Sequence, residues 1–271
     1  DFPEGKDLSF ETKYAILGTE VTDMVQRLDK LVASQGSWSR SDAQRCIRSG
    51  AVTVDGSVCR DPSAKVDPDG RQITVAGRLL RYRQSQYIML NKPPGILCVS
   101  RDPKARTVVD LVPEPLRRKG LFPAGRLDKD TVGLVLLTDD GDYAHRVLSP
   151  RKQIAKRYHA LVDGAVLPEH IDAFRRGTSL EDGTLCRPAG LRVLKEGGNP
   201  LTEVVITEGR YHQIKRMFAA LGLRVLWLKR VSIGGLVLDR RLEEGECREL
   251  TETEKEAVFA EQPYNFCEKC P

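Results

Sequence analysis

The sequence GRLDKDTVGLVLLTDDG, at residues 125–141, places a polar loop directly before a strongly apolar run. The aliphatic residues 134–137 predict a strand, and Asp140-Gly141 turns the chain out of it. Arg126 and Asp128 therefore lie on a loop that a rigid strand braces. A reactive carboxylate held in this way suits catalysis, so the segment marks a candidate active site.

The chain on both sides of this segment, from residue 87 to 258, mixes strand-like and helical patterns. Tyr87-Ile88-Met89-Leu90 reads as a buried strand, and the two prolines and the glycine of Asn91-Lys92-Pro93-Pro94-Gly95 enforce a turn after it. The many hairpin-like connections predict an α+β domain with a mixed, mainly antiparallel sheet. Further strands are expected at 134–137, 158–162, 191–194, 203–207 and 236–238, and helices at 142–148, 168–175 and 212–220.

Residues 21–80 form a smaller module of two helices followed by short strands. Apolar residues recur at helical spacing from Val25 to Val32, and Ser39 or Ser41 can cap a second helix that ends at Ser49-Gly50. Asp55-Gly56 between two β-prone runs is a hairpin signal, and residues 72–75 predict another strand. The remaining segments are read as an N-terminal arm (1–20), a polar linker (81–86) and a C-terminal tail (259–271).

The composition excludes several classes of protein. The 271 residues are 40% hydrophobic and 30% charged, as in globular proteins rather than disordered or fibrous ones. No apolar run approaches the roughly 20 residues that span a bilayer, so no membrane association is expected. The acidic start lacks the pattern of a secretory signal. Because the first residue is not Met, processing or truncation of the N-terminus stays open.

The positive charge is concentrated in two segments, although the net charge is only +5. Residues 144–161 contain five Lys or Arg and no acid, and residues 205–232 contain six Lys or Arg and one Glu. Residues 239–261 instead hold nine acids and four bases. Basic surface of this kind attracts nucleic acid. Judged by charge alone, basic residues on solvated helix faces explain the pattern equally well.

The cysteines argue against a disulfide framework. Their number is odd and most are scattered, which is typical of a protein from the reducing cytosol. Cys267 and Cys270 form a lone CxxC at the end of the chain, and a zinc site normally needs four ligands. We therefore expect a frayed tail and no metal there. The seven cysteines are Cys46, Cys59, Cys98, Cys186, Cys247, Cys267 and Cys270.

The N-terminal module resembles the S4 RNA-binding domain. The resemblance lies in Arg27-Leu28-Asp29-Lys30-Leu31, Ser39-Arg40-Ser41-Asp42-Ala43 and the run from Ile47 to Gly56. It implies that basic side chains of the helix pair and hairpin bind RNA phosphates, for which the planar guanidinium of Arg is well suited. Some of these side chains could instead be merely solvated. The candidates are Arg27, Lys30, Arg40, Arg45 and Arg48, of which Arg45 and Arg48 share a helix face.

The larger domain resembles the pseudouridine synthases. Gly-Arg-Leu-Asp at 125–128, followed by Asp-Thr-x-Gly-Leu at 130–134, is the signature of that family. The S4-like module, residues 91–95 and GRYHQIKRMF at 209–218 are similar to its RsuA-like branch, and the similarity covers roughly residues 24 to 250. It implies an enzyme that isomerises uridine to pseudouridine in ribosomal RNA.

The resemblance assigns roles to the residues of the key loop. Asp128 matches the catalytic carboxylate, whereas chemistry alone would not choose between Asp128 and Asp130, which is read as capping or bracing the loop. Arg126 matches the arginine that enters the stacked bases of the RNA helix at the place that the flipped-out target base has left. Flipping is needed because the glycosidic bond is out of reach inside a stack, and it costs a few kcal/mol.

Other segments supply the remaining candidates. Tyr158, in the basic-x-Tyr run 156–158, would stack on the uracil, although an ordinary core tyrosine is the alternative. Lys215 falls where relatives place a basic residue that pairs with the catalytic Asp and keeps it ionised, and its neighbour Arg216 would face elsewhere. Arg210 is an expected substrate-binding residue, and His212 is read as structural and close to the pocket.

The reaction itself limits the chemistry. It breaks the C1′–N1 bond and joins C1′ to C5 without adding atoms or electrons, so no cofactor or metal is required. Asp128 could attack C1′, attack C6 of uracil, or remove the C2′ proton to give a glycal. Sequence does not choose among these routes, and we favour action on the sugar. Asp128 is also the economical base for the final proton loss at C5.

The substrate and the alternatives remain open at this stage. The S4 domain and the lysine at 215 favour small-subunit (16S) rRNA over large-subunit (23S) rRNA or tRNA, and which uridine is modified is not determined. A non-catalytic S4-type ribosome assembly protein and an S4-bearing translation factor or synthetase are the other classes considered. The latter would need a nucleotide-binding signature, which the sequence lacks. We expect a cytoplasmic monomer.

Overall fold

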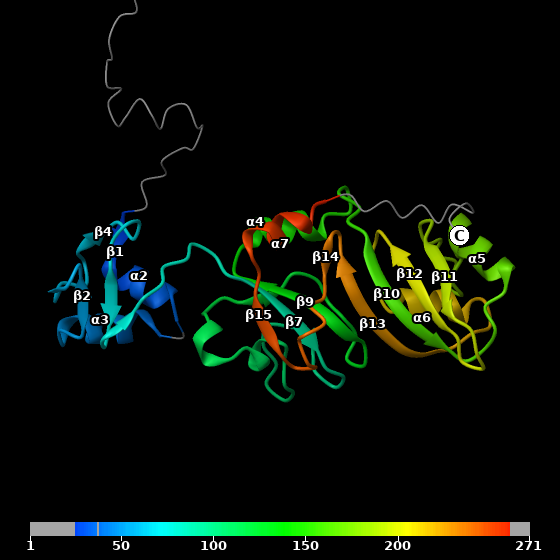
Figure 1. The fold of residues 1–271 in the computed structure, drawn as a ribbon, viewed down its shortest axis with the longest axis horizontal. Helices are drawn as coiled ribbons and strands as arrows, with labels where there is room; N and C mark the ends of the chain where they lie inside the picture. Colours follow the sequence, from blue (N-terminus) through cyan, green and yellow to red (C-terminus); the bar gives the residue numbers. More distant parts are fainter. Residues whose placement is uncertain (1–24, 37, 261–271) are drawn as a thin grey trace, which may run out of the picture. The chain divides into compact units, whose positions relative to one another are not determined.

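The computed structural model describes residues 25–36 and 38–260 (Figure 1). The contacts divide the chain into two units, 1–82 and 83–271, and the finer limits of 21–80 and 87–258 remain predictions. The expected arm at 1–20 and the CxxC of Cys267 and Cys270 lie outside the described residues. Within the described part, no helix is both long and apolar enough to cross a membrane.

The first unit packs two short helices on small antiparallel sheets. Leu28, Leu31, Ile47, Val52 and Ile73 lie in its core and are almost fully buried. The four-stranded sheet has the order β3-β2-β5-β6, and β1 pairs with β4. The elements are β1 (Gln26–Arg27), α2 (Leu28–Ser34), α3 (Arg40–Arg48), β2 (Val52–Val54), β3 (Ser57–Val58), β4 (Lys65–Val66), β5 (Ile73–Val75) and β6 (Arg78–Leu79).

Local signals explain this unit. Ser39 caps α3 in a reciprocal capping box with Asp42, so Ser39 rather than Ser41 is the cap. Asp55 and Gly56 both have positive φ, as the tight turn between β2 and β3 requires. The first helix begins at Leu28, and Val25 lies outside it, so the helical spacing placed its start too early.

The second unit contains a nine-stranded mixed sheet with the order β11-β12-β10-β13-β9-β7-β15, where β14 pairs with β13 and β8 with β9. All pairs are antiparallel except β9 with β13, so the predicted α+β class is confirmed. The strands are β7 (Tyr87–Lys92), β8 (Phe122–Pro123), β9 (Val132–Thr138), β10 (Lys156–Val162), β11 (Gly190–Lys195), β12 (Leu201–Ile206), β13 (Val225–Ile233), β14 (Leu236–Val237) and β15 (Cys247–Glu249).

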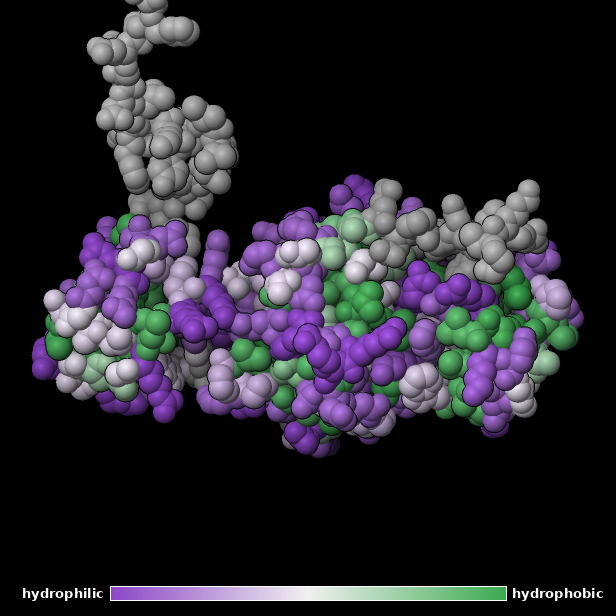
Figure 2. Space-filling view, viewed as in Figure 1, coloured by the Kyte–Doolittle hydropathy of each residue, from purple (hydrophilic) through white to green (hydrophobic). Residues whose placement is uncertain are grey.

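Both faces of the middle of this sheet are covered, which explains the apolar run that predicted β9. Val135 and Leu137 pack in one core cluster, and Leu134 and Leu136 pack in another. Because successive side chains of a strand point to opposite faces, a strand covered on both faces must be apolar throughout. In the view of Figure 2, hydrophilic residues cover most of this unit, with smaller hydrophobic patches over its strands.

The helices form the layers on the two faces. Phe174 of α5 and Phe218 of α6 belong to the first cluster, while Tyr143 of α4 belongs to the second, together with Val258 just after α7. The helices are α4 (Gly141–Leu148), α5 (Pro168–Arg176), α6 (Gln213–Ala219) and α7 (Glu252–Ala257), with short 3₁₀ turns at Val109–Leu111 and Glu114–Leu116.

The long strand β13 was not predicted. Its buried positions include the polar residues Arg230 and Ser232, whereas the aromatic residue Trp227 is 39% exposed. The usual pattern of buried apolar and exposed polar side chains is therefore reversed at these positions. It runs parallel to the start of β9, with Arg230 opposite Gly133. Gly133 has a φ of +98°, and a Cβ there would collide with the Arg230 carbonyl oxygen. Glycine at 133 therefore permits the pairing that joins β9 to β13.

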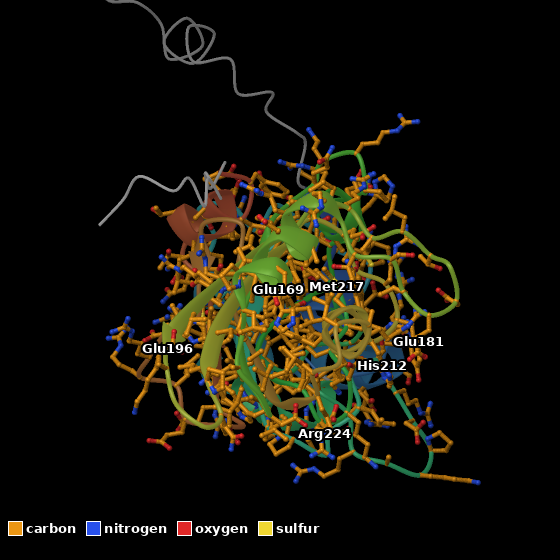
Figure 3. The ribbon with its side chains drawn as sticks, turned by 90° about the vertical axis from the view of Figure 1, so that its right-hand side faces the viewer. Glu169, Glu181, Glu196, His212, Met217 and Arg224 are labelled. Atoms are coloured by element: carbon orange, nitrogen blue, oxygen red, sulfur yellow. The ribbon has the colours of Figure 1, made fainter. Side chains whose placement is uncertain are left out.

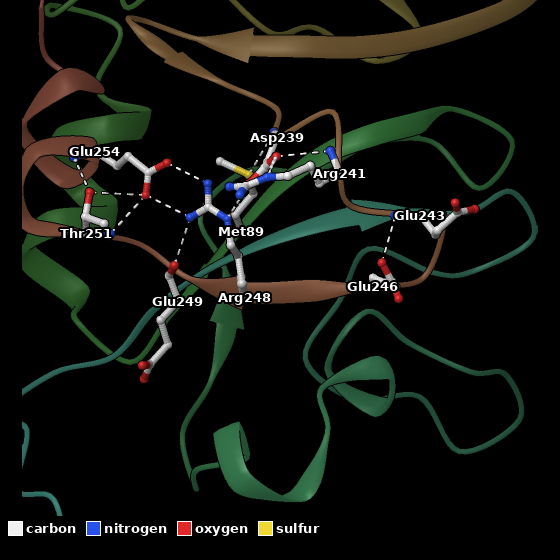
Figure 4. A network of polar contacts seen from close by, with 9 residues as sticks. All are labelled: Met89, Asp239, Arg241, Glu243, Glu246, Arg248, Glu249, Thr251 and Glu254. Atoms are coloured by element: carbon white, nitrogen blue, oxygen red, sulfur yellow. Dashed lines mark hydrogen bonds and ion pairs between the residues drawn. The ribbon is translucent and has the colours of Figure 1, made fainter.

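Carboxylates of the acidic segment 239–261 form ion pairs within this unit. Arg248 of β15 donates to Asp239 at 2.8 Å and to both oxygens of Glu254 at 2.7 and 2.8 Å (Figure 4). Glu254 also forms the capping box of α7 with Thr251. Arg248 thus ties β15 to the segment after β14 and to the last helix.

This network predicts a pH-dependent stability. The Arg248 hydrogen bonds lower the pKa of Glu254 from 4.5 to about 2. A lowered carboxyl pKa stabilises the fold fully above the unfolded pKa and loses this effect as the pH falls through the folded pKa. Glu254→Gln should therefore lower the melting temperature at pH 7, and its difference from wild type should shrink between pH 4.5 and 2. Thermal unfolding of both proteins across this range measures it.

The control is Glu252→Gln, because the Glu252 side chain is 88% exposed on the same helix and exposed ion pairs contribute little. A melting-temperature difference for Glu254→Gln that stays constant from pH 7 to 2 would contradict the assignment.

Candidate active site

The loop that carries Asp128 is held by the turn after β7. Lys92 is fully buried, and its ammonium group donates to the carbonyl oxygens of Pro93, Lys129 and Thr131 at 3.0, 3.0 and 2.9 Å. The Gly95 amide donates to the same Lys129 carbonyl at 2.8 Å. The turn at 91–95 is therefore a clamp on residues 129–131, a role that its sequence did not reveal.

Asp128 faces two basic side chains from the start of α6. Lys215 Nζ lies 3.5 Å from Asp128 Oδ2, and His212 Nε2 lies 3.6 Å from Oδ1. The two elements are far apart in sequence, so the sheet, through β9 and β13, brings them together.

Lys215 lies between two carboxylates. Its shorter contact is the 2.6 Å hydrogen bond to Asp130, whose pKa this bond lowers. Asp130 is 73% exposed, whereas the Asp128 side chain is 26% exposed. Asp130 thus holds Lys215 from the solvent side, and Asp128 is the carboxylate directed toward the interior. Arg216 points elsewhere and pairs with Asp182 at 2.6 Å.

A cleft of about 1040 Å³ surrounds Asp128. Its walls come from the loop after β8, from β10 and β13, and from the turn between β12 and α6. The structure brings together in it every candidate that the sequence placed in the larger domain. These are Arg126, Asp128, Tyr158, Arg210 and Lys215.

Arg230 and Lys156 are basic residues of the cleft that the sequence reading did not single out. Arg230 is only 2% exposed and donates from Nε to the Leu134 carbonyl at 2.8 Å, with a longer contact of 3.5 Å to the Arg126 carbonyl. Lys156 lies at the start of β10, and burial together with the Arg230 guanidinium lowers its pKa to about 8. The sequence did contain a signal for Lys156, which is the basic residue of the basic-x-Tyr run. The sequence of β13 contained no signal for Arg230.

The turn before α6 is built around Glu208. Its carboxylate accepts hydrogen bonds from Gln213 at 2.9 Å, from Arg210 at 3.2 Å and from the Arg187 amide at 2.9 Å. His212 then adopts a left-handed backbone, with a φ of 49°, and α6 begins one residue later than expected. Figure 3 labels His212 at this start and Met217 farther along the helix, where Met217 is fully buried. The left-handed residue turns the chain so that Lys215 meets the Asp128 loop.

The S4-like unit holds the other candidates, and some of them are paired. The Asp29 side chain is fully buried and accepts from Arg27 at 3.0 and 3.1 Å and from Arg40 at 3.2 and 3.3 Å. The Arg27 bond above all lowers the Asp29 pKa. Arg45 pairs with Asp42 on its own helix. All the candidates of this unit are exposed, namely Arg27, Lys30, Arg40, Arg45 and Arg48.

The described residues contain no cluster of three or more His, Cys, Asp or Glu side chains that could hold a metal ion. The five cysteines that lie within the described range are free.

Comparison with known proteins identifies the family. The S4 domain matches residues 26–71, and the RNA pseudouridylate synthase family matches residues 86–220. An uncharacterized RNA pseudouridine synthase of Bacillus subtilis, YtzG, is 44% identical over 230 residues, which are 84% of this chain and 96% of that protein. The chain belongs to the RNA pseudouridylate synthase family.

Two further relatives agree with this synthase assignment. Ribosomal small subunit pseudouridine synthase A of Escherichia coli is 43% identical over 233 residues, covering 86% of this synthase and 99% of the relative. A crystal structure of a pseudouridylate synthase superposes with a TM-score of 0.60 at 40% identity, covering 86% and 99% of the two chains. The predicted family, the S4 domain and the isomerase class are thereby confirmed.

Proposed function

We propose that this synthase converts one uridine of small-subunit ribosomal RNA to pseudouridine. The observation that carries the proposal is the cleft in which Asp128, Tyr158 and Lys215 meet. The relatives that are 43% identical over almost their whole length are named for the small ribosomal subunit. The basic S4-like unit supports an RNA substrate.

The proposed chemistry centres on Asp128. Lys215 and His212 lie within 3.6 Å of its oxygens, and each of the three possible routes uses the ionised carboxylate. After the C1′–N1 bond breaks and C1′ joins C5, the same carboxylate accepts the C5 proton. The routes through the sugar, which we favour, place Asp128 at C1′ or at the C2′ proton and leave the base free to rotate.

The neighbouring side chains are proposed to hold the flipped nucleotide. Tyr158 is buried in the cleft wall and supports the uracil ring. Arg126 is exposed on the Asp128 loop, from which its guanidinium can fill the gap that the flipped base leaves. Arg210, held by Glu208 at the cleft edge, is proposed to bind phosphate.

The S4-like unit is proposed to bind the same RNA through its exposed basic residues Arg27, Lys30, Arg40, Arg45 and Arg48. Because Asp128, Tyr158 and Lys215 line one cleft of a single chain, we propose that the synthase acts as a monomer. We also propose a cytoplasmic location, because an enzyme that modifies ribosomal RNA must reach the RNA where ribosomes are assembled.

Pseudouridine mapping of ribosomal RNA and tRNA from cells with and without this gene tests the proposal. One small-subunit uridine is expected to lose its modification in the deletion strain and to regain it when the wild-type gene is restored. Loss at a large-subunit or tRNA position would overturn the substrate but keep the reaction. No change at any position would contradict the catalytic role and favour an RNA-binding assembly protein.

A further inference from the structure

One aromatic ring at the cleft has no role in the chemistry above. Tyr211 lies in the turn between β12 and α6 and lines the cleft, yet 73% of it is exposed. Among the described residues, no hydrogen bond involves its hydroxyl group. Since burying a side chain of this size would stabilise the fold, its exposure at the site suggests a ligand rather than a structural contact.

The ring is held in a defined orientation. It stacks on the His212 imidazole with 3.8 Å between ring centroids and 20° between planes. His212 is itself fixed by its left-handed backbone and by its position 3.6 Å from Asp128. One face of Tyr211 is therefore covered by His212, and the stacked pair extends from Asp128 toward solvent.

The chemistry of this position fits an RNA base. Arg210 precedes Tyr211 and is held at the cleft edge by Glu208, and Arg187 lies on the same side of the cleft. Guanidinium groups bind phosphate, and an aromatic ring beside them offers a surface on which an unpaired base stacks. The target uridine must touch Asp128, so the base on Tyr211 belongs to a neighbouring nucleotide.

We infer that Tyr211, backed by His212, is a stacking platform for a base that flanks the target uridine. The inference rests on the proposed function, because it takes RNA as the substrate. The platform would hold the flanking nucleotide unstacked while its neighbour is turned into the cleft, and it contributes to binding rather than to the bond-breaking step.

The test uses the full chain and a small-subunit rRNA transcript. Tyr211→Leu is expected to raise KM about tenfold, as the loss of one base–aromatic stack does, with kcat changed less than about threefold. Trp227→Leu is the matched control, since Trp227 is an exposed aromatic residue of the same unit that does not line the cleft. A loss in kcat at unchanged KM would show that Tyr211 only positions His212, and would overturn the platform.

A binding experiment separates this inference from the proposed function. In an Asp128→Asn background, Tyr211→Leu should weaken the Kd for the same transcript about tenfold, and Tyr211→Phe, which keeps the ring, should recover it. Replacing the base on each side of the target in turn by an abasic residue should weaken binding at one side only, and only when Tyr211 is present. An unchanged Kd for Tyr211→Leu overturns the platform whether or not the wild type forms pseudouridine. The expected Kd changes, together with a wild-type protein that forms no pseudouridine, would support the platform and reject the proposed reaction.

Discussion

Replacing Asp128 by asparagine is expected to lower the rate of pseudouridine formation at least about 10³-fold, within the range that loss of a positioned acid–base group gives. The substitution removes the charge and keeps the size of the side chain. Each of the three routes needs the ionised carboxylate, so none survives the change. Single-turnover assays on a small-subunit rRNA transcript measure the effect.

RNA binding should be kept in this variant. Asp128 is an acid inside a basic cleft, so losing its charge removes repulsion toward phosphate rather than attraction. The Kd of Asp128→Asn for the transcript is expected to stay within about threefold of wild type or to become tighter. Loss of binding together with activity would indicate a misfolded cleft and would contradict a purely chemical role.

Asp130→Asn is the matched control, because it makes the same change two residues away. Asp130 holds the shorter bond to Lys215, at 2.6 Å, but it is largely exposed. Its loss should free Lys215 to approach Asp128 and change the rate less than about tenfold. A rate for Asp130→Asn as low as that of Asp128→Asn would contradict the assignment of the catalytic carboxylate.

Replacing Lys92 by methionine is expected to damage both stability and catalysis. The variant keeps the length of the side chain and removes its three hydrogen bonds to Pro93, Lys129 and Thr131. The buried Thr131 carbonyl loses its Lys92 donor, and an unpaired buried group costs about 1 to 3 kcal/mol. The part-buried Pro93 and Lys129 carbonyls add less, since Lys129 keeps the Gly95 amide, and removal of the desolvated ammonium offsets part of the loss. We expect the free energy of unfolding to fall by about 2 to 4 kcal/mol.

The catalytic loss follows from the position of the clamp. The Lys129 and Thr131 carbonyls flank Asp130, and the Thr131 amide donates to the Asp128 carbonyl at 3.2 Å. Without Lys92 the loop loses this restraint, and a displacement of about 1 Å at a reacting group can lower kcat about 10²-fold. The rate should be measured well below the melting temperature, where the variant is folded.

Lys119→Met provides the comparison, since Lys119 is an exposed lysine of the same unit. It is expected to leave stability and kcat close to wild type. A Lys92→Met protein with lowered stability but normal kcat would show that Lys92 supports the fold alone and does not position the loop.

The local signals of the sequence determined much of this protein. A helix cap at Ser39 or Ser41, the Asp55-Gly56 turn and the apolar run of β9 were readable because each depends on residues close together in the chain. The loop signature at 125–134 also identified the family. The sites carried over from that resemblance meet in one cleft, and their roles stay predictions until the variants are measured.

Only the tertiary structure decided how these pieces act together. β13 was not predicted because it buries Arg230 and exposes Trp227. Its sequence therefore lacks the alternation of apolar and polar residues that predicts a strand. The parallel pairing of β9 with β13 joins residues about a hundred positions apart, which no local pattern records. The hydrogen bonds of Lys92 to the Asp128 loop and the contacts of Lys215 with both Asp128 and Asp130 also join residues that are far apart in the sequence. Caps and turns depend on near neighbours, whereas the position of a buried charge depends on which distant carbonyls and carboxylates the fold places around it.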